Sequence, residues 1–468
     1  MIIEQIYTGC LAQGAYYIES NGEVAIIDPL REVQDYIDSA AKNNAKIKYI
    51  FETHFHADFV SGHVTLAEKT GAEIVFGPTA TTNFDAIIAE DNQVFKVGDI
   101  TITVLHTPGH TMESSCYLLK DENGKDHALF SGDTLFLGDV GRPDLAQKSD
   151  VTEKDLAGFL FDSLRTKVMT LADEVIVYPA HGAGSACGKN LSKETVGTIG
   201  NQKETNYALR ANMTKAEFIK EVTDGLLPPP AYFPLNVKLN KEGYKDIDEV
   251  LENSAKPLSV EAFEIHANET GAVILDVRHQ SEFIKGFIPQ SIFIGLGGTF
   301  APWVGALVKD IKQPILLVTP AGEEEATIIR LSRVGFDNVL GYLEGSFGTW
   351  EKAGKEIDTL ISVSADDLEE KIKENVVVFD VRKQSEYNNE HIEEVVNTPL
   401  DSLNDHISKF PKGEDFYLHC GGGYRSVIAA SILKARGIHN VIDVAGGYAA
   451  IRNTTIKRTA AVCPSTLK

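Results

Sequence analysis

An internal repeat in the second half of the chain constrains its fold more than any other feature. VILDVRHQSEF at 273–283 recurs 104 positions later as VVFDVRKQSEY at 377–387. A second apolar run follows each copy, PILLV at 314–318 and DFYLH at 415–419. Strands that alternate with helical segments in this way predict a parallel sheet flanked by helices. Because the repeat is as long as a domain, we expect two α/β domains rather than a solenoid.

The first half of the chain does not share this repeat. A proline-rich stretch, LLPPPAYFP at 226–234, separates the two halves and should stay extended. A chain of 468 residues is also too long for a single hydrophobic core. We therefore predict three domains, at 1–240, 257–355 and 362–468.

Charge and composition exclude several kinds of partner. The net charge of −23 argues against nucleic acid and anionic membranes. No apolar run reaches the roughly 18 residues of a membrane helix, and the N-terminal MIIEQIYTGC lacks the basic region of a signal peptide. Five scattered cysteines without CxxC pairs indicate no disulfide framework. We expect a cytoplasmic protein with reduced thiols, and self-association stays open.

The first domain repeats one kind of position. Six of its apolar stretches read as strands, and five of the six carry Asp or His at their ends. The side chains collected there are Asp28, His54, His56, Asp58, His110, Asp133 and His181. A single histidine at a strand end is usually a hydrogen-bonded structural residue. Repeated use of the position, where α/β folds gather their sites, instead predicts a metal centre.

Four motifs give this region a specific resemblance. They are THFHAD at 53–58, TPGHT at 107–111, SGDTLF at 131–136 and PAHG at 179–182. With them the region resembles the metallo-β-lactamase-fold hydrolases, which implies an αββα sandwich. Two-metal members of that family continue H-x-H with Asp and a further His, but this chain has Phe59 in place of that His. The two-metal interpretation is therefore weakened.

The motifs are most similar to those of the persulfide dioxygenases within that family. Their iron is held by the first His of H-x-H, the His of TPGHT and the Asp of GDTLF. The resemblance thus implies one Fe(II) per chain, held by His54, His110 and Asp133. Two imidazoles and a carboxylate form the facial triad of non-haem iron oxygenases, which leaves positions for a persulfide and O₂. The residues expected to orient these ligands are His56, Asp58 and His181.

Arg142 is a further candidate near the substrate. DVGRPDL at 139–145 matches a segment of the persulfide dioxygenases that follows the metal-binding Asp. Arg142 is therefore predicted to hold the substrate or its loop. The alternative is a loop arginine paired with Asp144.

Cys187 is the second such candidate. It lies in GAGSACGKN at 182–190, where Lys189 would favour a thiolate. We predict a thiol at the substrate entrance, and the alternative is a half-buried structural cysteine. Glutathione-using relatives have an acidic residue and a Tyr at this point, so the thiol that carries the persulfide stays open.

The second copy of the repeat contains a candidate nucleophile. CGGGYRS at 420–426 follows an apolar strand and precedes a helical run, and this C-x₄-R-S turn resembles the active loop of rhodaneses. Backbone N–H groups and a helix N-terminus in such a loop stabilise a thiolate or a persulfide. Cys420 is the expected nucleophile, and Arg425 would hold an anionic acceptor. The residues expected to cradle the sulfur are Gly421, Gly422, Gly423, Tyr424 and Ser426.

The first copy lacks this loop, because 257–355 contains no cysteine and three glutamates stand at 323–325. We expect an inactive rhodanese-like domain that serves in packing. Together the resemblances imply a fusion for sulfide detoxification. Its iron site would oxidise a small-molecule thiol persulfide with O₂ to sulfite, and Cys420 would pass sulfane sulfur to sulfite, giving thiosulfate. The alternatives are a glyoxalase II-like thiolester hydrolase with a rhodanese passenger, which needs two metals, and a sulfur carrier or sensor without oxidase chemistry.

Overall fold

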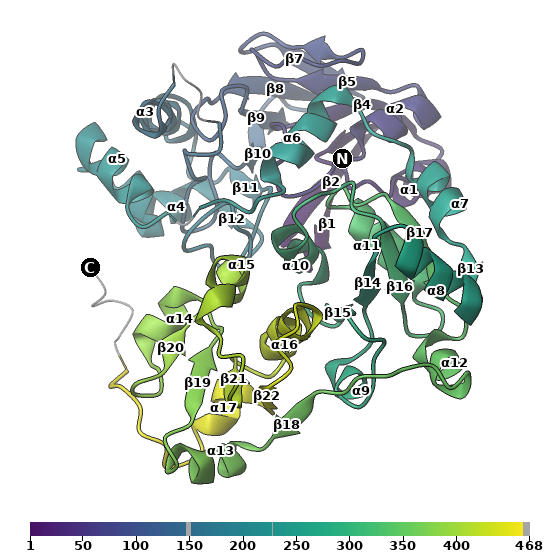
Figure 1. Cartoon of the computed structure of the whole chain (residues 1–468). Helices are drawn as coiled ribbons and strands as arrows, with labels where there is room; N and C mark the ends of the chain where they lie inside the picture. The colour runs from purple at the N-terminus through teal and green to yellow at the C-terminus, as the bar shows by residue number, and fades with distance from the viewer. Residues whose placement is uncertain (147–150, 227, 462–468) are drawn as a thin grey trace. The chain divides into compact units, whose positions relative to one another are not determined.

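The protein is described from a computed structural model that covers residues 1–146, 151–226 and 228–461 (Figure 1). It contains two compact units. The first is Met1–Val250 with Ser332–Gly335, and the second is Leu251–Leu331 with Phe336–Lys468. Within the described ranges, no helix combines the length and the apolar character needed to cross a bilayer.

The first unit contains two six-stranded sheets. In spatial order, the first sheet is β1 (Ile2–Thr8), β2 (Gln13–Ser20), β3 (Glu23–Ile27), β4 (Lys46–Glu52), β5 (Glu73–Phe76) and β6 (Ile87–Ile88). The second is β12 (Gly197–Thr198), β11 (Ile176–Pro179), β10 (Asp126–Gly132), β9 (Ser115–Lys120), β8 (Ile100–His106) and β7 (Val94–Val97). The pairs from β3 to β6 and the pair β10–β11 are parallel, and the others are antiparallel.

Alternating side chains of β2 connect two layers of this unit. Tyr16 points into the core between the sheets and meets Phe130 of β10, with 4.9 Å between ring centroids. The next residue, Tyr17, points into a second core that contains Leu66 of α2. A third core joins the second sheet to α3 through Leu160. Helices thus cover the outer faces of two stacked sheets, and the expected αββα sandwich is confirmed.

The helices of the first unit are α1 (Gln34–Lys42), α2 (His63–Thr70), α3 (Glu153–Ser163), the π-turn η1 (Leu164–Val168), α4 (Ile199–Thr205), the 3₁₀-turn η2 (Tyr207–Leu209), α5 (Lys215–Thr223), α6 (Phe233–Glu242) and the first half of α7 (Ile247–Ser254). Capping boxes begin α3, with Thr152 and Asp155, and α5, with Thr214 and Glu217. The proline-rich stretch was expected to be extended to residue 234. Its last proline instead lies in the first turn of α6, where a missing N–H has no cost.

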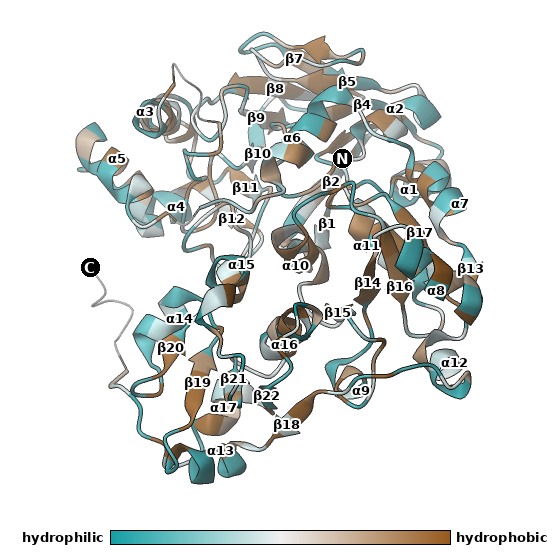
Figure 2. Ribbon diagram, in the orientation of Figure 1, coloured by the Kyte–Doolittle hydropathy of each residue, from teal (hydrophilic) through white to brown (hydrophobic). Residues whose placement is uncertain are grey.

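The second unit contains two five-stranded sheets with the same strand order, and every strand pair is parallel. The first is β13 (Pro257–Leu258), β17 (Val339–Leu343), β16 (Ile315–Val318), β14 (Val273–Asp276) and β15 (Ile292–Phe293). The second is β18 (Ile361–Val363), β22 (Val441–Val444), β21 (Phe416–His419), β19 (Val377–Asp380) and β20 (Val396–Asn397). Figure 2 shows β14, β16 and β19 as hydrophobic, as parallel strands buried on both faces should be. The duplicated parallel α/β domain is confirmed.

Helices surround both sheets of this unit. Those of the first copy are α8 (Val260–Glu269), α9 (Gln280–Phe283), α10 (Phe300–Leu307), α11 (Glu324–Ser332) and α12 (Ser346–Lys352). Those of the second copy are α13 (Ala365–Ile372), α14 (Gln384–Asn389), η3 (Leu400–Ser402), α15 (Leu403–His406), η4 (Ile407–Lys409), α16 (Arg425–Ala435) and α17 (Gly447–Ile451).

The repeated Asp-Val-Arg is a structural device. Arg382 binds Asp380 at the end of β19, with Nη2 2.6 Å from Oδ2, and it also donates to the carbonyl of Glu390 at 2.8 Å. Arg278 binds Asp276 at the end of β14 in the same way. Both pairs are buried, so each arginine closes the strand-to-helix turn with charge-assisted hydrogen bonds. The repeat therefore preserves the fold in both copies, while the chemistry of the loops differs.

Candidate functional site

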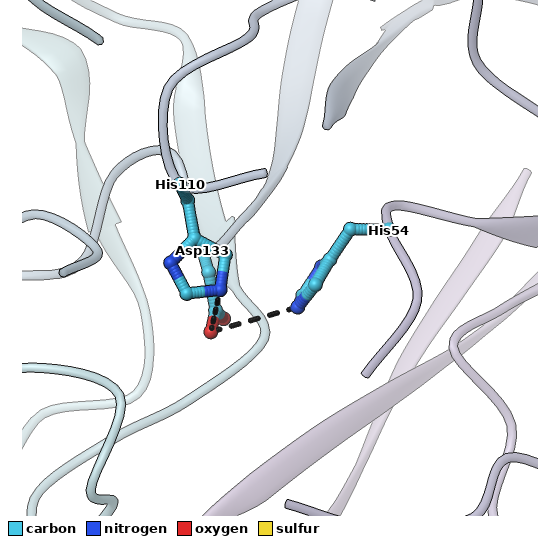
Figure 3. A group of neighbouring side chains, drawn as sticks. All are labelled: His54, His110 and Asp133. Atoms are coloured by element: carbon cyan, nitrogen blue, oxygen red, sulfur yellow. Dashed lines mark ion pairs between the residues drawn. The ribbon is translucent and has the colours of Figure 1, made fainter. Parts of the chain in front are cut away.

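Three side chains at strand ends of the first unit form the predicted metal site (Figure 3). His54 follows β4, His110 lies in the turn after β8, and Asp133 follows β10. Oδ2 of Asp133 lies 3.7 Å from Nε2 of His54 and 3.4 Å from Nε2 of His110. All three residues are buried. Their potential ligand atoms lie within 4.8 Å of one another, as expected for donors around one ion.

In both His54 and His110, a hydrogen bond at Nδ1 leaves Nε2 available to bind a metal. Nδ1 of His110 lies 2.8 Å from the carbonyl of Arg142, which can only accept, so Nδ1 carries the proton. Nδ1 of His54 lies 3.0 Å from the hydroxyl of Thr53. That hydroxyl already donates to Asp28 at 2.8 Å, so it must accept from His54. In both rings the lone pair is therefore on Nε2, the atom that faces Asp133.

Asp133 supplies the third donor. Its Oδ2 is buried and has no hydrogen-bond partner within the described ranges, while Oδ1 is bound by His181. Burial would raise the pKa of Asp133, but the nearby imidazoles outweigh it and hold the pKa well below its usual value. An ionised, buried oxygen without a partner is costly unless a cation satisfies it. The three residues therefore fit a divalent metal ion.

His181 occupies the region where a second metal would lie. Its Nδ1 is 2.8 Å from Oδ1 of Asp133, and its Nε2 is 2.8 Å from Oδ2 of Asp58. Burial lowers the pKa of His181, but these two carboxylates more than compensate, and the pKa lies well above its usual value. Asp58, His181 and Cys187 do come together. These three residues thus form a second group of potential ligands beside the first, in which His181 lies between two carboxylates.

The region around Phe59 is closed. The ring of Phe59 is fully buried and lies 4.4 Å from the ring of His56, between centroids. His56 faces away from the three ligands, with Nε2 3.1 Å from Oδ1 of Asp28. Asp28 also binds Thr53, and Thr53 orients His54. His56 is therefore connected to His54 through Asp28 and Thr53, which is compatible with its predicted orienting role. It remains a prediction.

The second site lies at the turn between β21 and α16. The backbone N–H of Gly423 donates to Sγ of Cys420 at 3.1 Å, and the hydroxyl of Ser426 lies 3.5 Å from the same sulfur. Gly421 leaves room for Arg425, because a Cβ there would stand 2.9 Å from its Nη2. The guanidinium of Arg425 binds Glu386 with both nitrogens, at 2.5 and 2.8 Å. The loop thus directs donors at the sulfur, as expected for a thiolate cradle.

The residues that bind the backbone of the Cys420 loop could not be identified from the sequence. The backbone N–H of Tyr448 donates to the carbonyl of Cys420 at 2.6 Å, and that of Ala449 donates to the carbonyl of Gly421 at 3.0 Å. Gly447 has a φ of +53°, and a Cβ there would stand 2.4 Å from the carbonyl oxygen of Cys420. With its carbonyls bound to the start of α17, the loop can present N–H groups to the sulfur. A pocket of about 230 Å³ adjoins the loop and is lined by Arg382, Glu386, Asn389, Gly421, Tyr448, Ala449 and Arg452.

Comparisons with known proteins agree with a division of the chain into a region that holds the candidate metal site and a duplicated α/β region. The metallo-beta-lactamase superfamily matches residues 8–181, and the rhodanese-like domain matches 259–353 and 364–454. A crystal structure of a metallo-beta-lactamase from Staphylococcus aureus subsp. aureus COL is 30% identical, with a TM-score of 0.64. The similarity covers 73% of this chain and 98% of that one. This chain belongs to the metallo-beta-lactamase superfamily.

Two other proteins are similar to parts of this superfamily member. The hydroxyacylglutathione hydrolase of Rhizobium johnstonii is 36% identical over 164 residues, or 34% of this chain and 57% of the relative. The chain thus spans little more than half of that curated relative. The crystal structure of ETHE1 from Myxococcus xanthus is 29% identical, covering 52% of this chain and 98% of that one, with a TM-score of 0.44.

Arg142 of this metallo-beta-lactamase domain binds its own loop through its guanidinium, which also donates to the carbonyl of Ala186 at 3.2 Å. Its guanidinium holds Asp144 with two hydrogen bonds of 2.6 and 2.7 Å, and its carbonyl orients His110. Gly141 allows this packing, because a Cβ there would stand 2.1 Å from the carbonyl oxygen of Asp133. The geometry thus agrees with the alternative of a loop arginine paired with Asp144.

Cys187 remains a prediction as a reactive thiol, but its surroundings do not favour a thiolate. Cys187 is buried, and burial together with the charges of Asp58 and Asp133 raises its pKa well above the usual value. Lys189 does not act on the thiol, because its Nζ donates to the carbonyls of Glu221 and Asp224. The sequence placed the two residues close together, but the chain directs their side chains to different neighbours. Cys187 therefore lies inside the site, beside His181, rather than at an entrance.

This burial predicts slow alkylation of Cys187. In a Cys420→Ser protein treated briefly with iodoacetamide, Cys187 should label at least about tenfold more slowly than the half-buried Cys10, since a rise of one pKa unit reduces the thiolate about tenfold. Peptide mapping by mass spectrometry measures both sites in one sample, and the buried Cys116 is the matched slow control. Labelling of Cys187 as fast as Cys10 would contradict its burial.

The sequence also did not indicate Asn240, which supports the metal-binding loop from α6. Its side-chain N–H₂ donates to the carbonyls of His56 and Phe59, both at 2.8 Å. Its Oδ1 accepts from the backbone N–H of Ser61 at 2.8 Å. One buried amide thus binds three backbone groups of the segment that follows His54. No local signal could have revealed it, because about 180 residues separate the partners.

Proposed function

We propose that this superfamily member is a non-haem Fe(II) persulfide dioxygenase coupled to a rhodanese sulfurtransferase. One observation carries the proposal. Two imidazoles and one carboxylate converge on one metal position, while His181 of the neighbouring group lies between Asp58 and Asp133. A facial set of this kind suits Fe(II) oxygenases, whereas metallo-hydrolases of the two-metal type need both ions. The proposed partners are a small-molecule thiol persulfide, O₂ and sulfite.

The reaction at the first site balances as RSSH + O₂ + H₂O → RSH + SO₃²⁻ + 2 H⁺. One iron per chain, when bound, supplies the redox chemistry by which O₂ reacts with a persulfide. His54, His110 and Asp133 would hold it, and the bonds of the two histidines to Thr53 and to the carbonyl of Arg142 fix their orientation. Phe59 keeps water out of the neighbouring volume.

At the second site Cys420 would act as a nucleophile. Its thiolate attacks the outer sulfur of a persulfide, the S–S bond of the donor breaks, and the donor leaves as a thiolate. Sulfite then attacks the outer sulfur of the Cys420 persulfide, which yields thiosulfate and regenerates the thiolate. The N–H of Gly423 stabilises the negative sulfur, and Arg425 attracts the sulfite dianion.

A thiolester hydrolase is the second candidate function. The relatives named hydroxyacylglutathione hydrolase favour it, although the match spans only 57% of the one from Rhizobium johnstonii. That chemistry would need a second metal to help activate water. A second ion would have to displace the proton between Nε2 of His181 and Asp58, which makes this candidate the weaker one.

Oxygen uptake and metal content together test the proposal. The full chain, loaded anaerobically with Fe(II), should bind one iron and consume one O₂ for each sulfite formed, with the sulfite converted to thiosulfate included in the count. The same sample should not hydrolyse thiolesters. Two bound zinc ions with thiolester hydrolysis would establish the second candidate instead. Persulfide formation at Cys420 without O₂ uptake would indicate a sulfur carrier.

A further inference from the structure

The side chain of Tyr424 leaves the Cys420 loop and enters the middle rhodanese-like domain. Its hydroxyl donates to the carbonyl of Gly295 at 2.7 Å. Its ring lies edge-on to Phe293, with 5.9 Å between centroids. A Cβ at Gly298 would stand 2.5 Å from Cζ of the tyrosine, closer than real Cβ atoms approach. The ring therefore occupies space that only a glycine at 298 leaves open.

A second hydrogen bond joins the same parts of the two domains, which belong to one compact unit. The backbone N–H of Phe293 in β15 donates to the hydroxyl of Ser431 in α16 at 2.9 Å. Both groups are buried. The helix that follows the Cys420 loop is thus attached to the middle domain through Ser431, and the loop itself through Tyr424.

Tyr424 stands between two residues that act on the sulfur. Before it, Gly423 donates its N–H to Sγ of Cys420 at 3.1 Å, in a backbone conformation with a φ of +92°. After it, Arg425 begins α16. Burial raises the pKa of Tyr424, so its hydroxyl stays neutral and donates. A shift of the tyrosine ring that the backbone of Tyr424 follows would move the Gly423 N–H, the Arg425 guanidinium or both.

We propose that the middle domain, which has no cysteine of its own, positions the sulfur-transfer loop of the neighbouring domain through Tyr424. The Gly295–Gly298 segment receives the tyrosine side chain and thereby holds the Gly423 N–H on the sulfur of Cys420. Tyr424 is a positioning residue in this arrangement, rather than part of the sulfur cradle predicted from the sequence. The proposal rests on the sulfur transfer assigned above to Cys420.

Two neighbouring glycines provide a matched test in the full chain. Gly298→Ala places a methyl group against the tyrosine ring, whereas Gly297→Ala meets nothing within 4 Å. Persulfide-to-sulfite transfer should fall by more than about tenfold in Gly298→Ala and stay unchanged in Gly297→Ala. Tyr424→Phe, which keeps the ring but loses one hydrogen bond, should lower it about fivefold. The loss should lie in kcat rather than in KM for sulfite.

The rate of alkylation of Cys420 at one fixed pH gives a second readout, which a merely structural role would not change. The rate should fall about tenfold in Gly298→Ala, because the thiolate loses the Gly423 N–H. In a Tyr424→Ala background the clash is absent, so adding Gly298→Ala should cost nothing further. If Gly298→Ala does not fold, the Tyr424→Phe variant tests the proposal in its place.

The outcomes separate the two proposals. If the unmodified chain transfers no sulfur to sulfite, the assigned function of Cys420 fails. If it transfers sulfur, but Tyr424→Phe and Gly298→Ala match Gly297→Ala in the rate of transfer and in the rate of Cys420 alkylation, the positioning role fails. Additive losses in the double variant would also overturn it, since they would mean that Gly298 acts through something other than the tyrosine.

Discussion

Replacement of His110 by Ala should abolish both metal binding and persulfide-dependent O₂ uptake. The loss should exceed about 100-fold, because changes to residues that merely orient a ligand already cost about 10–100-fold in affinity or activity. His110 contributes one of only two imidazoles, and the protonated His181 cannot replace it. Elemental analysis after desalting and an oxygen electrode trace measure the two effects on one sample.

His106→Ala is the matched control for this variant. His106 ends β8, four residues before His110, and its ring lies 2.9 Å from the carbonyl of Met112, outside the ligand set. Iron content and O₂ uptake should be unchanged in it. A His110→Ala protein that kept one iron and its O₂ uptake would show that the metal lies elsewhere.

Replacement of Cys420 by Ser should change the product rather than the oxidation. A hydroxyl at this position forms no persulfide, so thiosulfate formation should fall by more than about 100-fold while sulfite accumulates. O₂ uptake should remain within about twofold, because the residue lies in the second unit and the metal ligands lie in the first. Ion chromatography of sulfite and thiosulfate, run beside the oxygen electrode, gives both results.

Cys10→Ser controls for the loss of a thiol, since Cys10 is half-buried and belongs to neither site. It should leave both products unchanged. If Cys420→Ser lost its O₂ uptake with iron still bound, the two reactions would depend on one another. Continued thiosulfate formation would place the sulfur acceptor at another residue.

The sequence was sufficient to bring the metal donors together. His54, His110 and Asp133 each follow an apolar strand, and strands of two packed sheets end at one edge of the sandwich. The pattern therefore placed the strand-end residues near one another, and the choice of these three among them came from the resemblance to the persulfide dioxygenases. The Cys420 loop could be predicted for a different reason, since its donors and its sulfur come from seven consecutive residues.

The remaining parts of both sites depend on partners far away in the chain, which no local pattern encodes. Asn240 reaches His56 across about 180 residues, and Tyr424 reaches Gly295 across about 130. Lys189 is two positions from Cys187, yet tertiary packing gives the two side chains different surroundings. Closeness in the sequence did not predict side-chain contact where a long side chain, such as that of Lys189, could reach several other partners.

The position of Asn240 limits how far the part of the chain that holds the candidate metal site can serve as an independent domain. The superfamily match ends at residue 181, and a proline-rich segment at 226–234 invites separation there. Cutting at either point would remove α6 and leave two carbonyls and one N–H of the metal-binding loop without their shared amide. Each orphaned group costs about 1–3 kcal/mol. The three groups together therefore cost an amount comparable with the free energy of unfolding of a marginally stable domain. A transplant of this chemistry into another protein must therefore carry the chain past Asn240.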